Sequence, residues 1–289
     1  MTTERRDASF AGDGFCAQDA TAARSASARP EVMEPCDVAA AGVGNAAEKL
    51  ELIMGAEGLS RLASAHVAVL GLGGVGSNCV EALARGGVGN LFLVDRDIVQ
   101  ASNINRQAIA FRSTLGRRKV DVMRAMVADI NPLAAVETRH MLVLRENLGE
   151  LLDEMRAWAE ADGGALDYVV DAIDTVSAKL ALAEIAQERG ITLISSMGAA
   201  NKLHPEALRI ADLYDTVNCP LCRIMRKEGR KRGIRRLRVL YSAEEPVRVP
   251  TREGAARSER SNLGTASFMP PIMGQMIAGA VLRELAGLM

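Results

Sequence analysis

A polar stretch between residues 95 and 107 carries side chains suited to binding a nucleotide phosphate. Acids, amides and an arginine follow an apolar segment there: Asp95, Asp97, Asn103, Asn105, Arg106 and Gln107. The forked guanidinium of Arg106 can neutralise phosphate oxygens, and Asn103 and Asn105 can orient a nucleotide through hydrogen bonds. A plain solvated loop would also be polar, but it would rarely hold this combination. The stretch therefore favours a binding site.

Lys119 follows this stretch at the start of a predicted helix. The helix has an apolar face made of Val120, Met123, Met126, Val127 and Ile130. From its first turn, the ammonium of Lys119 can reach the same phosphates as a point charge. The alternative is an ordinary solvated lysine.

Two carboxylates, Asp171 and Asp174, follow the apolar segment 166–170. Carboxylates at the end of a parallel strand lie on the ligand-binding edge of a doubly wound sheet. Beside a triphosphate, Asp174 is suited to hold Mg²⁺, which prefers carboxylate, water and phosphate oxygens. The alternative for either residue is to cap the helix predicted over 176–187. We favour Asp174 as the metal ligand and Asp171 as a structural support.

A buried strand and a glycine-rich loop must position these groups. The apolar run 66–70 predicts the strand, and the loop after it has the Gly-x-Gly-x-x-Gly spacing and contains Gly71, Gly73, Gly74 and Gly76. Such a loop lets the backbone approach a phosphate, and the following helix directs its free N–H groups at it. Asp95, about 20 residues further on, can accept hydrogen bonds from a ribose. A dehydrogenase, an adenylating enzyme and a tight structural turn all fit this loop.

The order of apolar segments predicts an α/β fold. We expect a Rossmann-like, doubly wound, mainly parallel sheet with an α+β extension at its C-terminal end. The predicted strands are 66–70, 90–94, 136–143, 166–170 and 191–195, and the predicted helices include 77–84, 148–158 and 176–187. Gly55 and Gly58 are expected to break the helical pattern that leads into the first strand.

Composition divides the chain into an extension and one large domain. Residues 1–44 are rich in alanine, serine, glycine and aspartate without an apolar period, so we predict a disordered N-terminal extension. Residues 45–289 form the domain, with a nucleotide-binding half at 45–200 and a second half at 201–289. The apolar segment 266–282 is expected to be a buried helix and not a membrane anchor, because Pro270, Pro271 and Gln275 interrupt it.

The cysteines indicate a reducing compartment. An odd number, five, in a chain of 289 residues argues against a disulfide framework. No apolar run of signal-peptide length follows the first residues, so we expect a cytoplasmic protein. Cys219 and Cys222 form one Cys-x-x-Cys pair, whereas a closed zinc site needs four ligands. We favour two buried or helix-start thiols over a zinc site or a redox pair.

A local run of positive charge contrasts with the net charge of −1. Nine lysines and arginines lie between residues 223 and 238, of which we single out Arg223, Arg226, Lys227, Arg230 and Lys231 as candidate contacts to the phosphates of a nucleic acid. No aromatic residue interrupts the run, so it predicts phosphate contact without base stacking. The alternative is a solvated helix face.

Taken together, these motifs resemble the ThiF/MoeB superfamily, whose members are adenylating enzymes related to the ubiquitin-activating enzymes. The glycine loop, the pair Asp95 and Asp97, the residues 102–107, Lys119, and the pair Asp171 and Asp174 carry the likeness. The segments 196–202, 223–233, 241–246 and 264–271 resemble the tRNA threonylcarbamoyladenosine dehydratase branch. The resemblance runs from about residue 48 to the C-terminus.

This resemblance implies an ATP- and Mg²⁺-dependent adenylating enzyme. In this branch the substrate is the threonyl carboxylate of the modified adenosine beside the tRNA anticodon, and the neighbouring carbamoyl group closes a ring with loss of AMP. Arg106, Lys119 and Asp174 would be the catalytic residues, and the second half of the domain would bind tRNA and form a homodimer. The resemblance leaves open a cysteine desulfurase or sulfur-acceptor protein as a further partner, and implies no membrane association.

Three other functions compete with this interpretation. The first is activation of a ubiquitin-like sulfur carrier; the absence of a second Cys-x-x-Cys pair and the basic run count against it. The second is a nicotinamide-dependent dehydrogenase, which gives no role to Arg106, Lys119 and Asp174. The third is an RNA-binding scaffold without activity, which the complete set of ATP-binding residues disfavours.

Overall fold

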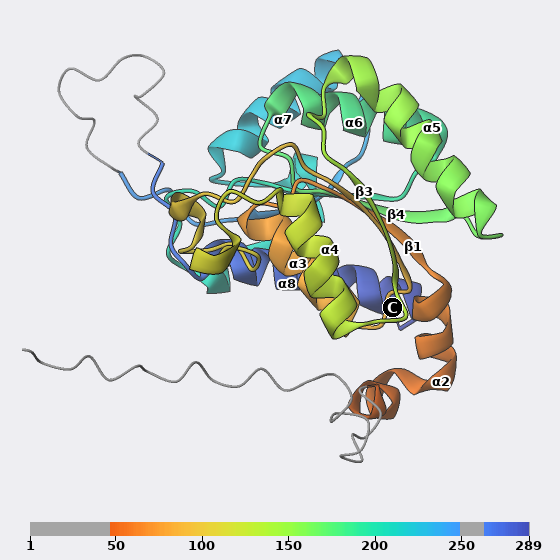
Figure 1. The fold of residues 1–289 in the computed structure, drawn as a ribbon. Helices are drawn as coiled ribbons and strands as arrows, with labels where there is room; N and C mark the ends of the chain where they lie inside the picture. Colours follow the sequence, from red (N-terminus) through yellow and green to blue (C-terminus); the bar gives the residue numbers. More distant parts are fainter. Residues whose placement is uncertain (1–46, 249–262, 289) are drawn as a thin grey trace, which may run out of the picture. The chain divides into compact units, whose positions relative to one another are not determined.

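The computed structural model describes residues 47–248 and 263–288, so the predicted disordered extension 1–44 lies outside the described residues. The described residues form an α/β fold around a seven-stranded sheet with the strand order β3-β2-β1-β4-β5-β7-β6 (Figure 1). All its pairings are parallel except that between β6 and β7. The predicted Rossmann-like, mainly parallel sheet is confirmed.

The elements of this part of the chain have the following bounds. The strands are β1 (His66–Leu70), β2 (Asn90–Val94), β3 (Ala135–Arg139), β4 (Leu166–Asp171), β5 (Leu193–Ser196), β6 (Leu208–Asp212) and β7 (Arg238–Ser242). The α-helices are α2 (Glu48–Ser64), α3 (Gly74–Arg85), α4 (Lys119–Ile130), α5 (Arg145–Ala161), α6 (Val176–Arg189), α7 (Pro220–Lys231) and α8 (Met269–Leu285).

Helices cover both faces of the sheet, as Figure 1 shows, with α3, α4 and α8 on one face and α5, α6 and α7 on the other. Successive side chains of a strand point to opposite faces. Val67 and Val69 of β1 therefore pack in the core beneath α3 and α8, whereas Ala68 and Leu70 pack in the core beneath α5 and α6. Because both faces are covered, β1 and β2 are buried along their whole lengths and appear in the sequence as continuous apolar runs.

The strand order places a crevice where the site must lie. The chain winds from β1 through β2 to β3 on one side, and then continues through β4 and β5 on the other side of β1. At such a switch point, the connections that follow neighbouring strands diverge and leave room for a ligand beyond the carboxyl ends of the strands. The glycine loop follows β1, Asp95 follows β2, and Asp174 follows β4.

The C-terminal helix α8 packs closely on α3. A Cβ atom on Gly274 would lie 2.4 Å from the backbone oxygen of Val75, so only glycine allows this approach. Gly279, in contrast, has no described atom within 4 Å of its would-be Cβ. The predicted buried helix is confirmed, and none of the described helices has the length and apolar character needed to cross a membrane.

The end of the third predicted strand and one predicted helix break differ from the structure for local reasons. The third strand was expected to reach Val143 but ends at Arg139, since the chain then turns so that Val143 packs in the core beneath α5. Gly55 interrupts α2 with a φ of 71°, as expected, but Gly58 does not break the helix. Its missing side chain serves packing instead, because a Cβ there would touch Ala286 at 3.4 Å.

Candidate active site

A cavity of about 680 Å³ opens at the carboxyl ends of the strands. The glycine loop, the polar stretch after β2, and the segments after β4 and β5 surround it. The predicted site residues that line it are Gly71, Gly73, Gly74, Asp95, Asp97, Asn103, Arg106, Gln107, Lys119 and Asp174. Of the predicted nucleotide-binding residues, Gly76 and Asn105 are not in its wall.

The glycines of the loop have distinct structural roles. Gly71 has a φ of 92°, and a Cβ on it would lie 2.6 Å from the backbone oxygen of Ala172. A Cβ on Gly76 would lie 1.8 Å from the backbone oxygen of Gly71, so this position holds α3 against the loop. A Cβ on Gly73 would meet no described atom within 4 Å. Gly73 is thus the position at which the backbone is open to a ligand in the cavity.

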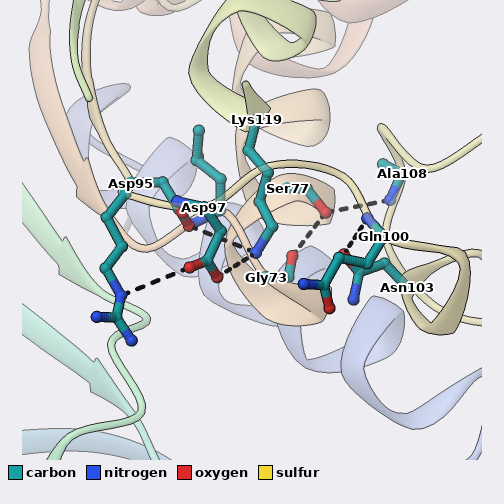
Figure 2. Close-up of polar contacts among 10 residues, drawn as sticks. Gly73, Ser77, Asp95, Asp97, Gln100, Asn103, Ala108 and Lys119 are labelled. Atoms are coloured by element: carbon teal, nitrogen blue, oxygen red, sulfur yellow. Dashed lines mark hydrogen bonds and ion pairs between the residues drawn. The ribbon is translucent and has the colours of Figure 1, made fainter. Parts of the chain in front are cut away.

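Asp95 joins the end of β2 to the glycine loop. One carboxylate oxygen accepts the N–H of Leu72 at 2.6 Å, and the other accepts the N–H of Asp97 at 2.7 Å. Ser77, in the first turn of α3, makes a second connection: its hydroxyl donates to the Gly73 oxygen at 2.7 Å and accepts the N–H of Ala108 at 3.1 Å (Figure 2). Asp95 therefore shapes the loop, and its contact with a ribose stays a prediction.

Lys119 is not a solvated lysine, because only 4% of its surface is exposed. Its ammonium lies 2.8 Å from a carboxylate oxygen of Asp97 and 3.9 Å from one of Asp95. Figure 2 shows the Lys119 side chain directed at both acids. These two acids hold a buried positive charge at the wall of the cavity. An anionic ligand can share this ammonium with Asp97, whose carboxylate remains half exposed.

Arg106 is held by its neighbours in the polar stretch. Its guanidinium donates to the backbone oxygen of Ser102 at 2.9 Å and to the Asn105 side chain at 2.7 Å. Asn105 in turn donates to the backbone oxygen of Thr265 at 3.3 Å, next to α8. Asn105 thus holds the Arg106 guanidinium in place and lies outside the cavity wall.

Gln107 carries an unused acceptor at the cavity. Its side chain is 7% exposed, and its Oε1 atom has no hydrogen-bond partner among the described residues. A buried polar atom without a partner costs free energy, so a ligand that donates a hydrogen bond would satisfy it. The other amide of this stretch, Asn103, accepts the N–H of Gln100 at 3.0 Å and so shapes the backbone.

Asp171 and Asp174 have separate environments at the end of β4. Asp171 is 1% exposed and accepts hydrogen bonds from the Lys179 ammonium at 2.9 Å, from the Ser195 hydroxyl and from the N–H of Ile173. Asp174 is exposed to the cavity, and the Thr175 hydroxyl donates to it at 3.2 Å. Neither caps α6, whose preceding residue is Thr175. The helix-cap alternative is therefore wrong.

Sequence reasoning missed Lys179. Its side chain is 2% exposed and joins α6 to β4 and β5, because its ammonium also donates to the backbone oxygen of Ser196 at 2.7 Å. A signal was present: Lys179 lies on the helix face that carries Leu182 and Ala186, where an apolar side chain would be expected. A charged residue on such a face indicates a buried partner.

The nine basic residues do not form a single surface. Arg223, Lys227, Arg230 and Lys231 are exposed and share one face of α7, given the helical period. Arg226 instead turns back and donates to the backbone oxygen of Thr216 at 2.8 Å. Arg238 lies in β7 and pairs with Glu284. The run itself contains no aromatic residue, but Arg230 lies over the ring of Tyr214, which precedes the run, at 5.1 Å.

A model of the ThiF family matches residues 46–288. The chain belongs to the ThiF family. It is 40% identical over 244 residues to the tRNA threonylcarbamoyladenosine dehydratase of Bacillus subtilis, which covers 81% of this chain and 92% of that protein. The crystal structure of the E. coli tRNA N6-threonylcarbamoyladenosine dehydratase in complex with ATP matches with a TM-score of 0.71 and 28% identity, over 83% of this chain and 93% of that chain.

A sulfur-carrier activator is a more limited match. The SAMP-activating enzyme E1 of Haloferax volcanii is 33% identical over 154 residues, which cover 53% of this chain and 52% of that protein. The dehydratase relative thus shares most of its length with this ThiF family chain, and the activator about half.

The glycine loop of this ThiF family protein allows a matched pair of substitutions. Gly76→Ala is expected to cost about 1–3 kcal/mol of unfolding free energy, because the new methyl group collides with the Gly71 backbone. Gly73→Ala is expected to leave the free energy of unfolding nearly unchanged and to weaken ATP binding. Urea denaturation and calorimetric titration check this prediction. Equal stability losses in the two variants would contradict it.

Proposed function

We propose that this ThiF family protein is an ATP-dependent tRNA threonylcarbamoyladenosine dehydratase. It adenylates the threonyl carboxylate of the modified adenosine beside the tRNA anticodon and closes the cyclic product. One observation carries the substrate class: the exposed basic face belongs to α7, and the first turn of α7 lines the nucleotide cavity through Pro220 and Leu221. A tRNA on this face would therefore lie beside the bound ATP.

The reaction makes a poor electrophile reactive. A carboxylate oxygen attacks the α-phosphorus of ATP and pyrophosphate leaves. The carbamoyl group then attacks the activated carbonyl carbon, and AMP leaves with one oxygen of the original carboxylate. No covalent protein intermediate is needed, so the chain contributes positioning and charge neutralisation.

The described side chains suit these two tasks. The buried ammonium of Lys119 and the anchored guanidinium of Arg106 lie on one wall of the cavity and can neutralise phosphate oxygens. The open backbone at Gly73 allows a phosphate to approach the start of α3. The unpaired acceptor of Gln107 can receive a hydrogen bond from the nucleotide.

Mg²⁺ fits Asp174. No group of three or more His, Cys, Asp or Glu side chains that could enclose a metal occurs in the described part of the chain. Mg²⁺ is commonly bound by one or two carboxylates together with substrate phosphates, and the exposed carboxylate of Asp174 supplies that arrangement. When bound, the ion would withdraw charge from the phosphate oxygens.

The experiment is a reaction with purified components. The protein is incubated with tRNA carrying threonylcarbamoyladenosine, ATP and Mg²⁺, and the nucleosides are analysed by mass spectrometry. We expect a nucleoside lighter by one water, and none when NAD replaces ATP. Failure to form it, together with ATP-dependent adenylation of a ubiquitin-like sulfur carrier, would support the activator function instead.

The basic face should control the salt dependence of tRNA binding. Arg223 and Lys227 have no ion-pair partner among the described residues, so the Arg223→Ala/Lys227→Ala double variant tests the face without removing an internal contact. Each lost phosphate contact should lower the slope of log affinity against log salt by about 0.7–0.9. ATP affinity should not change.

The matched control is the Arg235→Ala/Arg236→Ala double variant. It removes two exposed arginines that lie beyond the end of α7, and the same number of charges. An identical slope in wild type and in both variants, measured by filter binding over a salt series, would show that the face of α7 is only solvated.

We also propose a homodimer that acts in the cytoplasm, where its tRNA substrate occurs. Several large apolar side chains between residues 98 and 115 are exposed, namely Ile98, Ile104, Phe111 and Leu115. Burial of such side chains is typical of an interface between subunits. We therefore propose an interface in the nucleotide-binding half, and not in the half 201–289 to which the resemblance assigned it. Light scattering in buffer without detergent is expected to give twice the monomer mass, and a monomer at micromolar concentration would contradict it.

The interaction with a cysteine desulfurase or sulfur acceptor stays a prediction.

A further inference from the structure

The Cys-x-x-Cys pair lies at the start of α7, against the cavity. Cys219 precedes the helix and lines the cavity, whereas Cys222 in the first turn is fully buried. The Cys219 sulfur accepts the Cys222 backbone N–H at 3.5 Å. The two cysteines thus lie together at the wall of a cavity whose adenylation chemistry uses neither thiol.

The surroundings of the pair make the two thiols unequal. The hydrogen bonds from the Cys222 thiol and backbone, with the positive charge of Lys202, outweigh burial and lower the pKa of Cys219 to about 6. The shared proton and burial raise the pKa of Cys222. The start of a helix and the Cys-x-x-Cys spacing both favour the thiolate of the first cysteine. Cys219 is therefore the nucleophile of the pair.

Other roles for this pair are less well supported. Within the described residues no third His, Cys, Asp or Glu completes a metal-binding group with the two sulfurs. Simple core packing is illustrated by Cys79, which is fully buried in α3 and whose pKa burial raises to about 12. Cys219 differs from Cys79 in both its access to the cavity and its polar contacts.

We propose that Cys219 and Cys222 are a reversible redox-modification site that reacts with low-molecular-weight disulfides. The Cys219 thiolate attacks one sulfur of the small disulfide, forms a mixed disulfide and releases one small thiolate. Cys222 then gives up its proton and attacks the Cys219 sulfur, which forms the Cys219–Cys222 disulfide and releases the second small thiol. The protein dithiol is oxidised by two electrons and the small disulfide is reduced to two thiols.

Oxidation would change the wall of the cavity. The buried side chain of Lys202 donates to the backbone oxygen of Glu244, and its positive charge favours the Cys219 thiolate. Loss of that negative charge leaves Lys202 with less compensation at the point where α7 begins. The site thereby goes beyond the dehydratase reaction, since no step of adenylation needs a thiol.

The test uses the full chain and oxidised glutathione as the probe. The reduced protein is treated at pH 7, quenched, and mapped by peptide mass spectrometry, which separates this pair from the other cysteines. We expect the peptide with Cys219 and Cys222 to lose two hydrogens. Cys222→Ser should stop at a glutathione adduct on Cys219, and Cys219→Ser should leave Cys222 unmodified.

A second measurement needs no cysteine variant. The rate of Cys219 alkylation by iodoacetamide is followed against pH in the wild type, with Cys79 as the internal comparison. We expect the alkylation rate of Cys219 to rise with a midpoint near pH 6 in the wild type. In Lys202→Met this midpoint should move to higher pH. A midpoint near the ordinary thiol value of about 8.5, or no disulfide in the folded wild type, would overturn the proposal.

Discussion

Asp174→Ala is expected to lower the rate of ATP-dependent cyclisation at least about 100-fold, as loss of a group that stabilises transition-state charge typically does. The carboxylate is exposed to the cavity, and in the proposed function it holds Mg²⁺ against the phosphates of ATP. The free energy of unfolding of this variant should differ from that of the wild type by less than about 0.5 kcal/mol, because the Asp174 side chain is exposed. Single-turnover kinetics and urea denaturation measure the two effects.

The variant Asp174→Asn tests whether the loss of activity comes from the charge of Asp174. The amide keeps the size of the side chain and removes its charge, so a loss similar to that of the alanine variant would assign the effect to the charge. Unchanged activity in both variants would remove Asp174 from the mechanism. Unfolding of both variants would show a structural role instead.

Asp171→Ala is expected to destabilise the fold by about 3–5 kcal/mol, since it leaves a buried cation without its partner. Both Asp171 and Lys179 are about 1% exposed at their side chains, and the two charges lie 2.9 Å apart. The Ser195 hydroxyl donates to the same carboxylate and would lose its acceptor. Thermal and urea denaturation measure the loss, which should exceed that of Asp174→Ala.

A double variant separates the lost ion pair from lost packing. Asp171→Ala/Lys179→Met removes both charges and retains most of the volume of the lysine. It should be more stable than Asp171→Ala alone, because no buried charge is left unpaired. A double variant that is as unstable as the sum of the two single variants would contradict the ion-pair explanation.

Much of the fold could be predicted from the sequence, because local patterns determined it. Strands buried on both faces require continuous apolar runs, so β1, β2 and β4 were placed within one residue of their bounds. The glycine spacing fixed the loop after β1, and the acids after β2 and β4 fell at the same edge of the sheet. The residues that line the cavity could be predicted because they follow these strands at this edge of the sheet.

The remaining features depend on contacts between distant segments. No local pattern shows that Asp95 holds the Leu72 backbone, or that the Lys119 ammonium lies between Asp95 and Asp97. Lys179 was missed because lysine is usually a surface residue, and its partner Asp171 is eight positions away on another element. The direction of a long side chain such as Arg226 also depends on the neighbouring segment.

Adenylation of the threonyl carboxylate is tested most directly by following one oxygen atom. The threonyl carboxylate of the tRNA-bound nucleoside is labelled with ¹⁸O, and the protein is given ATP and Mg²⁺. Adenylation of that carboxylate transfers one labelled oxygen to phosphorus, so we expect ¹⁸O in the phosphate of the released AMP. Cyclic product with unlabelled AMP would contradict adenylation of the carboxylate, and with it the proposed dehydratase reaction.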